Sequence, residues 1–93
     1  FPAVDVARRC LKASEKHTTV LNAANEQAVH SFLNGVIGYL DIVPTVADVI
    51  DAMDAQLSAK PLFESVEEVE QLEREARARA DEHIATIGKT KNL

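Results

Sequence analysis

The chain has 93 residues, a formal charge of -5 and an apolar fraction of 46%, but aromatic residues make up only 4% and Trp is absent. This length supports one small core, which must be built from Ala, Val, Leu and Ile. The basic residues are scattered or paired with Glu, and no apolar run approaches the ~20 residues of a membrane span. We therefore expect neither nucleic acid nor a membrane as a partner.

The first predicted helix covers about residues 3–14. Pro2 suits a first turn because its missing N–H would be unpaired there. Cys10, the single cysteine, excludes an internal disulfide and lies on an apolar stripe, so we interpret it as a buried small hydrophobe and not as a nucleophile. The stripe recurs at three- and four-residue steps and consists of Val4, Ala7, Cys10 and Leu11.

A loop is predicted over residues 14–19, because this polar segment ends in two threonines and interrupts the period. Asn22 is the predicted N-cap of a second helix, with Asn25 and Glu26 in its first turn. Gly35 can supply a left-handed C-terminal cap. The apolar stripe between these ends is Leu21, Ala24, Ala28, Val29, Phe32 and Leu33, and residues 37–40 are expected to form a turn.

The third predicted helix starts with Asp41 as N-cap and Pro44 in its first turn. Pro61 ends it, because a proline disfavours helical geometry at the preceding residue, Lys60. Three aspartates, at positions 48, 51 and 54, share its polar face. The opposite face is formed by Ile42, Val46, Val49, Ile50, Met53 and Leu57.

The fourth predicted helix covers about residues 65–87. Ser65 and Glu68 form a capping box, and Glu residues four positions before Arg74, Arg77 and Arg79 stabilise its exposed face. We expect Gly88 to close it and residues 88–93 to form a frayed tail. Its apolar face is Val66, Val69, Leu72, Ala76, Ala80, Ile84 and Ile87.

Four amphipathic helices without strand alternation predict an all-α fold, a small four-helix bundle-like domain spanning residues 1–93 as a single unit. Glu26 and His30 could share a metal, but two ligands do not make a site. His17 and His83 are interpreted as solvated or packed, and the three aspartates as a solvated face. We expect no catalytic, cofactor-binding or metal-ligating residue in this chain.

One run of the chain resembles the C-terminal part of the 1-deoxy-D-xylulose 5-phosphate reductoisomerase family. The run is Leu21-Asn22-Ala23-Ala24-Asn25-Glu26, followed by Ala28-Val29 and Phe32-Leu33. The loop from Lys12 to Thr19 departs from the glycines that the family tends to place there. Further residues match in register: Phe1-Pro2-Ala3, Ile37, Tyr39, Asp41, Ile42, Ser65 to Val69, and Ala76-Arg77 with Ala80.

The resemblance implies a longer enzyme that converts 1-deoxy-D-xylulose 5-phosphate to 2-C-methyl-D-erythritol 4-phosphate with NADPH and Mg²⁺ or Mn²⁺. It implies a homodimer of the bacterial cytoplasm, or of a plastid-type organelle in a eukaryote. The family's dinucleotide domain, metal ligands and substrate contacts precede its C-terminal domain. This fragment is therefore expected to be inactive by itself and to support the catalytic domain.

Asn22, Asn25 and Glu26 are the predicted interdomain residues, since the expected helix start concentrates amides and an acid at one exposed end. The absence of an initial Met and the Phe1-Pro2 start favour a piece of a longer enzyme. The alternative from another class of function is an independent helical module that binds a partner helix through an apolar groove.

Overall fold

The computed structural model describes residues 2–91, with side chains over residues 3–88. Its elements are α1 (Pro2–Ala13), α2 (Glu15–Leu33), a short 3-10 helix η1 (Tyr39–Asp41), α3 (Ile42–Ala59) and α4 (Val66–Lys91). The described residues form no strand, so the predicted all-α class is confirmed. That residues 1–93 make a single domain stays a prediction.

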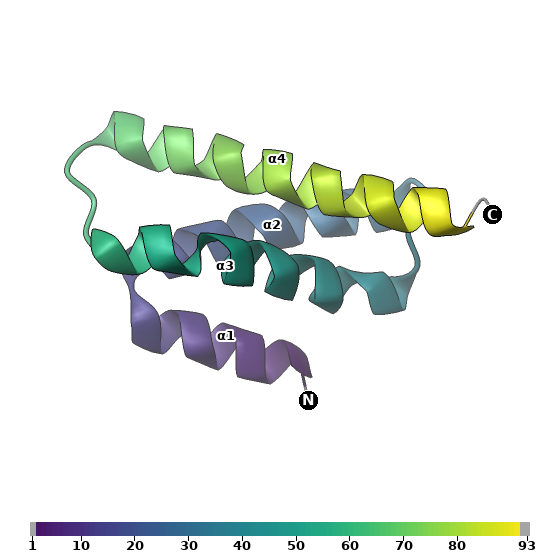
Figure 1. Cartoon of the computed structure of the whole chain (residues 1–93), viewed down its shortest axis with the longest axis horizontal. Coiled ribbons are helices and arrows are strands. Elements are labelled where there is room, and N and C mark those ends of the chain that lie inside the picture. The colour runs from purple at the N-terminus through teal and green to yellow at the C-terminus, as the bar shows by residue number, and fades with distance from the viewer. Residues whose placement is uncertain (1, 92–93) are drawn as a thin grey trace.

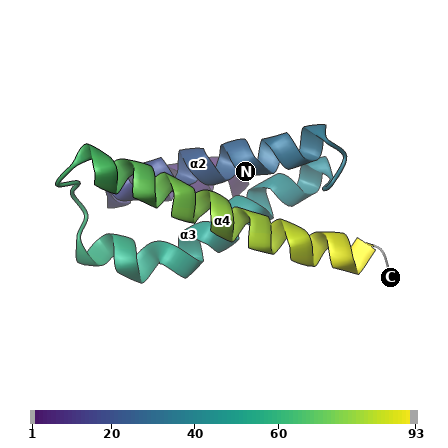
Figure 2. The ribbon, with the colours of Figure 1, turned by 90° about the horizontal axis from the view of Figure 1, so that it is seen from above.

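Helix α2 packs against the three other α-helices. Figure 1 shows α1 alongside α3, on the side away from α4. Figure 2 shows α4 running diagonally across the pair formed by α2 and α3. The turn from α2 to α3 and the end of α4 lie at one end of the bundle, the connection from α3 to α4 lies at the other, and α1 starts about midway along it (Figure 1).

The loop predicted for residues 14–19 is wrong, because α2 begins at Glu15. Ser14 separates α1 from α2 and is the true N-cap; its Oγ accepts a hydrogen bond from the His17 N–H at 3.1 Å. Lys16, His17 and Val20 are buried against the bundle. Their packing outweighs the weak helix preference of the neighbouring threonines, as tertiary context routinely does. Asn22 is thus an interior residue of α2.

The C-terminal end of α2 follows the prediction closely. Gly35 has φ +75°, the left-handed conformation that favours glycine. Its N–H donates to Phe32 O at 3.0 Å, and the next N–H, of Val36, donates to Ser31 O at 2.9 Å. These two bonds are the Schellman arrangement, which satisfies carbonyls that the helix end would leave unpaired.

Helix α3 was predicted with nearly its observed bounds. Lys60 is its C-cap, and Pro44 lies in its first turn. The Asp41 carboxylate accepts from the Gly38 N–H at 2.8 Å and so fastens the η1 turn that precedes the helix. The predicted apolar face is buried from Val46 onward, with Ile42 packed at its edge.

Helix α4 runs past its predicted end. The Glu68 N–H donates to Ser65 Oγ at 3.1 Å, as the capping box predicts, but the Glu68 carboxylate turns to Lys16 of α2. Gly88 does not close the helix, and the frayed tail is wrong for residues 88–91, which are helical. One glycine inside a helix costs only about 1 kcal/mol relative to alanine, too little to stop α4. Residues 92–93 lie outside the described residues.

The core is built from small and branched aliphatic residues, as composition predicts. Three alanines of α2 are buried, which lets α3 and α4 approach it closely. Several predicted stripe residues are exposed instead: Val4 (49%), Leu11 (72%), Leu33 (74%) and Val66 (70%). Helix α1 buries Cys10 and packs Val6 against the core, since only a narrow strip of it contacts the bundle. The fully buried side chains include Cys10, Val20, Val49, Ile50, Met53 and Leu57.

Candidate interdomain surface

The three predicted interdomain residues are exposed, but they do not share a helix end. Glu26 Oε2 accepts from Arg77 Nη2 at 2.9 Å, which turns Glu26 toward α4. Asn22 lines the same shallow hollow between α2 and α4 as Glu26. Asn25 lines a different groove, beside α1 and α3. The reason given for the prediction, a polar helix start, is therefore wrong, while the exposure of the three side chains holds.

The face of α2 toward α4 is occupied by contacts within the bundle. Arg77 Nη2 lies 2.9 Å from Glu26 Oε2 and 3.9 Å from Glu73 Oε2, so the predicted pair within α4 exists but is the longer of the two. Gln27 Nε2 donates to Asp81 Oδ1 at 2.7 Å. This polar strip holds α2 to α4.

Glu26 and His30 do not form the start of a metal site. Glu26 is paired with Arg77, and the His30 ring nitrogen Nε2 lies 3.0 Å from Asn34 Nδ2. Across the part of the chain that the structure describes, no three His, Cys, Asp or Glu side chains are grouped so as to hold a metal.

The aspartates of α3 are more than the solvated face that the sequence predicts. Asp54 Oδ1 lies 2.8 Å from His17 Nε2, and Asp51 accepts from Arg9 of α1. Asp48 Oδ2 lies 3.1 Å from His83 Nδ1 of α4. The three side chains remain 47–63% exposed, yet each of them ties a neighbouring helix to α3.

His17 is buried in the first turn of α2, with 1% of its surface exposed. Its Nδ1 lies 2.6 Å from Ser14 Oγ, and its Nε2 contacts Asp54. With the ring proton on Nε2, the imidazole donates to Asp54 and accepts from the Ser14 hydroxyl, whose oxygen also accepts the His17 N–H. This Ser-His-Asp arrangement is thus a satisfied helix cap, in which the half-buried Ser14 hydroxyl is engaged by the ring and the N–H of His17.

Three pKa values in this region are displaced, and that of the Arg9 guanidinium is raised by its hydrogen bond to Asp51. The hydrogen bond from His17, and then the positive charge of Arg9, hold the pKa of the Asp54 carboxyl below its usual range. Burial raises the pKa of the Cys10 thiol. A thiol with a raised pKa carries little thiolate at neutral pH, so the interpretation of Cys10 as a packing residue agrees with its chemistry.

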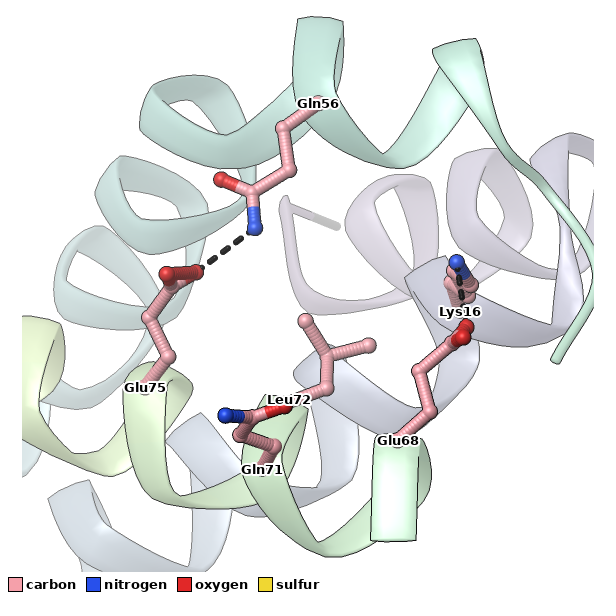
Figure 3. Close-up of a pocket in the computed structure, with 6 residues that line it drawn as sticks. All are labelled: Lys16, Gln56, Glu68, Gln71, Leu72 and Glu75. Carbon is pink, nitrogen blue, oxygen red and sulfur yellow. Dashed lines mark hydrogen bonds and ion pairs between the residues drawn. The ribbon is translucent and has the colours of Figure 1, made fainter. Parts of the chain in front are cut away.

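A polar hollow of about 260 Å³ lies between α2, α3 and α4 at the α3–α4 end (Figure 3). Lys16 Nζ lies 2.6 Å from Glu68 Oε1 and 5.6 Å from the centroid of the Phe63 ring. Gln56 Nε2 donates to Glu75 Oε2 at 2.7 Å. Lys16 pairs with Glu68 and Glu75 accepts from Gln56, so these contacts across the hollow link α2 and α3 to α4.

A larger groove, of about 820 Å³, lies between α1, α2 and the start of α3. Tyr39 and Leu40 of η1 form one of its walls and are 72% and 86% exposed. The Tyr39 ring meets Phe32 edge to face, with centroids 5.8 Å apart. Ten residues line the groove and none is charged. The sequence feature that could have indicated this groove is the apolar segment 37–40, which we interpreted only as a packed turn.

No helix among the described residues has the length and apolar character that a membrane span requires.

The family model and the relatives that match this chain carry the same enzyme name. A family model described as the DXP reductoisomerase C-terminal domain matches residues 1–79. The 1-deoxy-D-xylulose 5-phosphate reductoisomerase of Bifidobacterium longum strain DJO10A is 66% identical over 84 residues, covering 90% of this chain and 21% of that protein. No solved structure matches the chain.

Two further relatives, from Beutenbergia cavernae and Corynebacterium jeikeium, carry the same enzyme name and are each 46% identical. They cover 91% and 92% of this chain, and 21% and 20% of their own lengths. The chain thus spans about a fifth of the length of these relatives. On this family match and these identities, the chain belongs to the DXP reductoisomerase C-terminal domain family.

Proposed function

We propose that this chain is the helical C-terminal domain of an enzyme that converts 1-deoxy-D-xylulose 5-phosphate to 2-C-methyl-D-erythritol 4-phosphate. The observation that carries the proposal is its 66% identity, over 90% of the chain, to a protein named as this reductoisomerase. NADPH and Mg²⁺ or Mn²⁺ would serve that reaction in the rest of the enzyme, which we call the parent. A homodimeric parent in the bacterial cytoplasm completes the proposal.

The carboxylates of α3 do not fit the divalent metal ion. The carboxylates of α3 are directed to three different partners, Arg9, His17 and His83, and so do not converge on one point. Divalent cations of this kind need several oxygen ligands around a single centre. The chain therefore supports the reaction by packing against the catalytic part, and it contributes no reacting group.

Support of this kind needs a stiff body and an exposed surface. The helices are cross-linked by polar contacts at the α3–α4 end, where Lys16 and Glu68 join α2 to α4. Asn25 lies in the apolar groove, and we propose it as an interdomain contact. Asn22 and Glu26 are proposed as a second, polar interdomain strip beside α4.

The comparisons do not favour the alternative of an independent interaction module, because the matching relatives are named as enzymes, and the matched part covers only 21% of their length. The two alternatives also predict different behaviour. A free-standing module would bind its partner without the rest of a reductoisomerase, whereas a supporting domain is needed for the turnover of its parent.

Truncation tests the proposal. A parent that ends just before Phe1 should lose most of its NADPH-dependent turnover and unfold at a lower temperature, while the separate 93-residue chain should oxidise no NADPH. A truncated parent with full turnover and an unchanged melting temperature would contradict the supporting role. Turnover by the separate chain would contradict the claim that the reacting groups lie elsewhere.

A further inference from the structure

The apolar groove differs from the rest of the surface in its charge. None of the ten residues that line it is charged, whereas 27% of the chain is Asp, Glu, Lys or Arg. Depletion of charge at the centre of a patch, together with aromatic residues, distinguishes the cores of protein interfaces from ordinary surface. The composition of the groove is therefore that of a contact surface.

Two of the residues that line the groove are strongly exposed. Leu40 is 86% exposed and Tyr39 is 72% exposed, so neither contributes much to the core of this domain. Leu33, the last residue of α2, and Val36, in the connection that follows, are also exposed, although neither lines the groove. A run of apolar side chains left in water at one turn indicates a surface that another body covers.

The position of α1 indicates which body that is. Ala3, in the first turn of α1, lines the groove together with Val6. The chain spans about a fifth of its relatives and belongs to their C-terminal domain family, so in the parent a preceding segment would enter α1 at the edge of the groove. Because that part would be covalently joined to α1, it would have a high effective concentration at the groove.

We propose that the groove between α1, α2 and the start of α3 is the docking site for an uncharged, apolar surface of the part of the parent that precedes α1. This inference rests on the proposed function and identifies the surface through which the support is transmitted. Leu40 is the side chain that inserts into the partner. Asn25, the one amide in the groove, hydrogen-bonds a polar group at the edge of the contact.

Two matched leucine variants of the full-length parent test the site. Leu40→Asp places a charge on the docking surface. Leu62→Asp is the control, because Leu62 is 68% exposed, does not line the groove and lies in the α3–α4 connection at the opposite end of the bundle (Figure 1). Both side chains are exposed, so both variants should keep the helical content of the wild type in circular dichroism.

The readout is the rate of limited proteolysis at the junction before Phe1. Leu40→Asp should raise this rate at least tenfold, and Leu62→Asp should leave it within twofold of the wild type. An unchanged rate in Leu40→Asp would overturn the docking site. The proposal would also be overturned if Leu40→Asp converted a dimeric parent to a monomer without raising the rate of proteolysis at the junction. The groove would then be occupied by a second copy of the chain.

A measurement on the unmutated parent covers the case in which Leu40→Asp fails to fold. Amide hydrogen exchange over residues 39–47 should be at least tenfold slower in the parent than in the separate chain, and equal rates would overturn the proposal. The test is independent of the truncation result. If the truncated parent loses turnover but the junction of the Leu40→Asp parent resists proteolysis as in the wild type, the supporting role stands. The groove would then not be the docking site.

Discussion

His17 Nε2 lies 2.8 Å from Asp54 Oδ1 and joins the first turn of α2 to the last third of α3, 37 residues away in the sequence. The histidine is almost fully buried, and Arg9 of α1 approaches the same carboxylate. One carboxylate thus holds three helices together. We therefore expect these contacts to weaken when acid protonates Asp54.

The pH dependence follows from the lowered pKa of Asp54. A group with a depressed folded-state pKa stabilises the fold above its unfolded pKa of about 3.9, and this stability is lost as the pH falls through the folded-state value. Asp54→Asn should therefore be less stable than the wild type at pH 7 and should lose less stability between pH 5 and pH 3. Urea unfolding across this pH range measures both effects. Asp5→Asn, on the exposed side of α1, is the control, and identical pH profiles of Asp54→Asn and the wild type would refute the account.

The observed start of α2 can be tested through its cap. Ser14→Ala removes the hydroxyl that accepts the His17 N–H and should lower the free energy of unfolding by about 1 kcal/mol. Asn22→Ala, at the exposed interior position, should change it by less than about 0.5 kcal/mol. Chemical denaturation of the two variants compares them directly. A larger loss for Asn22→Ala would restore the predicted helix start.

Alanine substitutions at Gly35 and Gly88 should change the free energy of unfolding in opposite directions. Gly35→Ala forces a side chain into the left-handed region and should cost about 1–2 kcal/mol. Gly88→Ala, in a helix and with no atom within 4 Å of the added Cβ, should stabilise by about 0.5–1 kcal/mol. Thermal unfolding would show one melting temperature falling and the other rising. Destabilisation by Gly88→Ala would mean that α4 ends before this residue.

Lys16 is the most buried cation of the described bundle, with 10% of its side chain exposed. Lys16→Ala should cost about 2–3 kcal/mol, because Glu68 then keeps a partly buried charge without its partner. Replacing both residues, as Lys16→Met with Glu68→Leu, should cost less than Lys16→Ala, since neither charge remains. If the double variant were less stable than Lys16→Ala in urea, the attraction between Lys16 and Glu68 would outweigh the cost of removing their charges from water.

The sequence predicted the elements whose signals are local. Helix α3 carries a strict apolar period between Pro44 and Pro61, and Gly35 is the residue type that a left-handed cap needs. The start of α2 was missed because Ser14 is followed three positions later by His17, where a capping box has Glu or Gln. The two threonines after it then favoured a loop.

The contacts between distant residues could not be predicted in the same way. Asp54 and Arg9 are polar residues on solvent-facing positions of their own helices, and only the packing of α1 alongside α3 brings them together. The groove is likewise assembled from α1, α2 and the η1–α3 segment, whose separate patterns give no sign that they meet. Asn25 was predicted as an interdomain residue because α2 was expected to start at Asn22, which is wrong. Asn25 nevertheless lines this groove.

The exposure of Tyr39 in the full-length parent tests the central claim most directly, because this is the single tyrosine of the chain and a wall of the groove. Tyr39 is 72% exposed in the separate domain, so tetranitromethane should nitrate it readily there. Peptide mapping of the nitrated parent should find Tyr39 modified at least tenfold more slowly. Equal nitration in the parent and in the separate chain would contradict the docking of the catalytic part onto this groove.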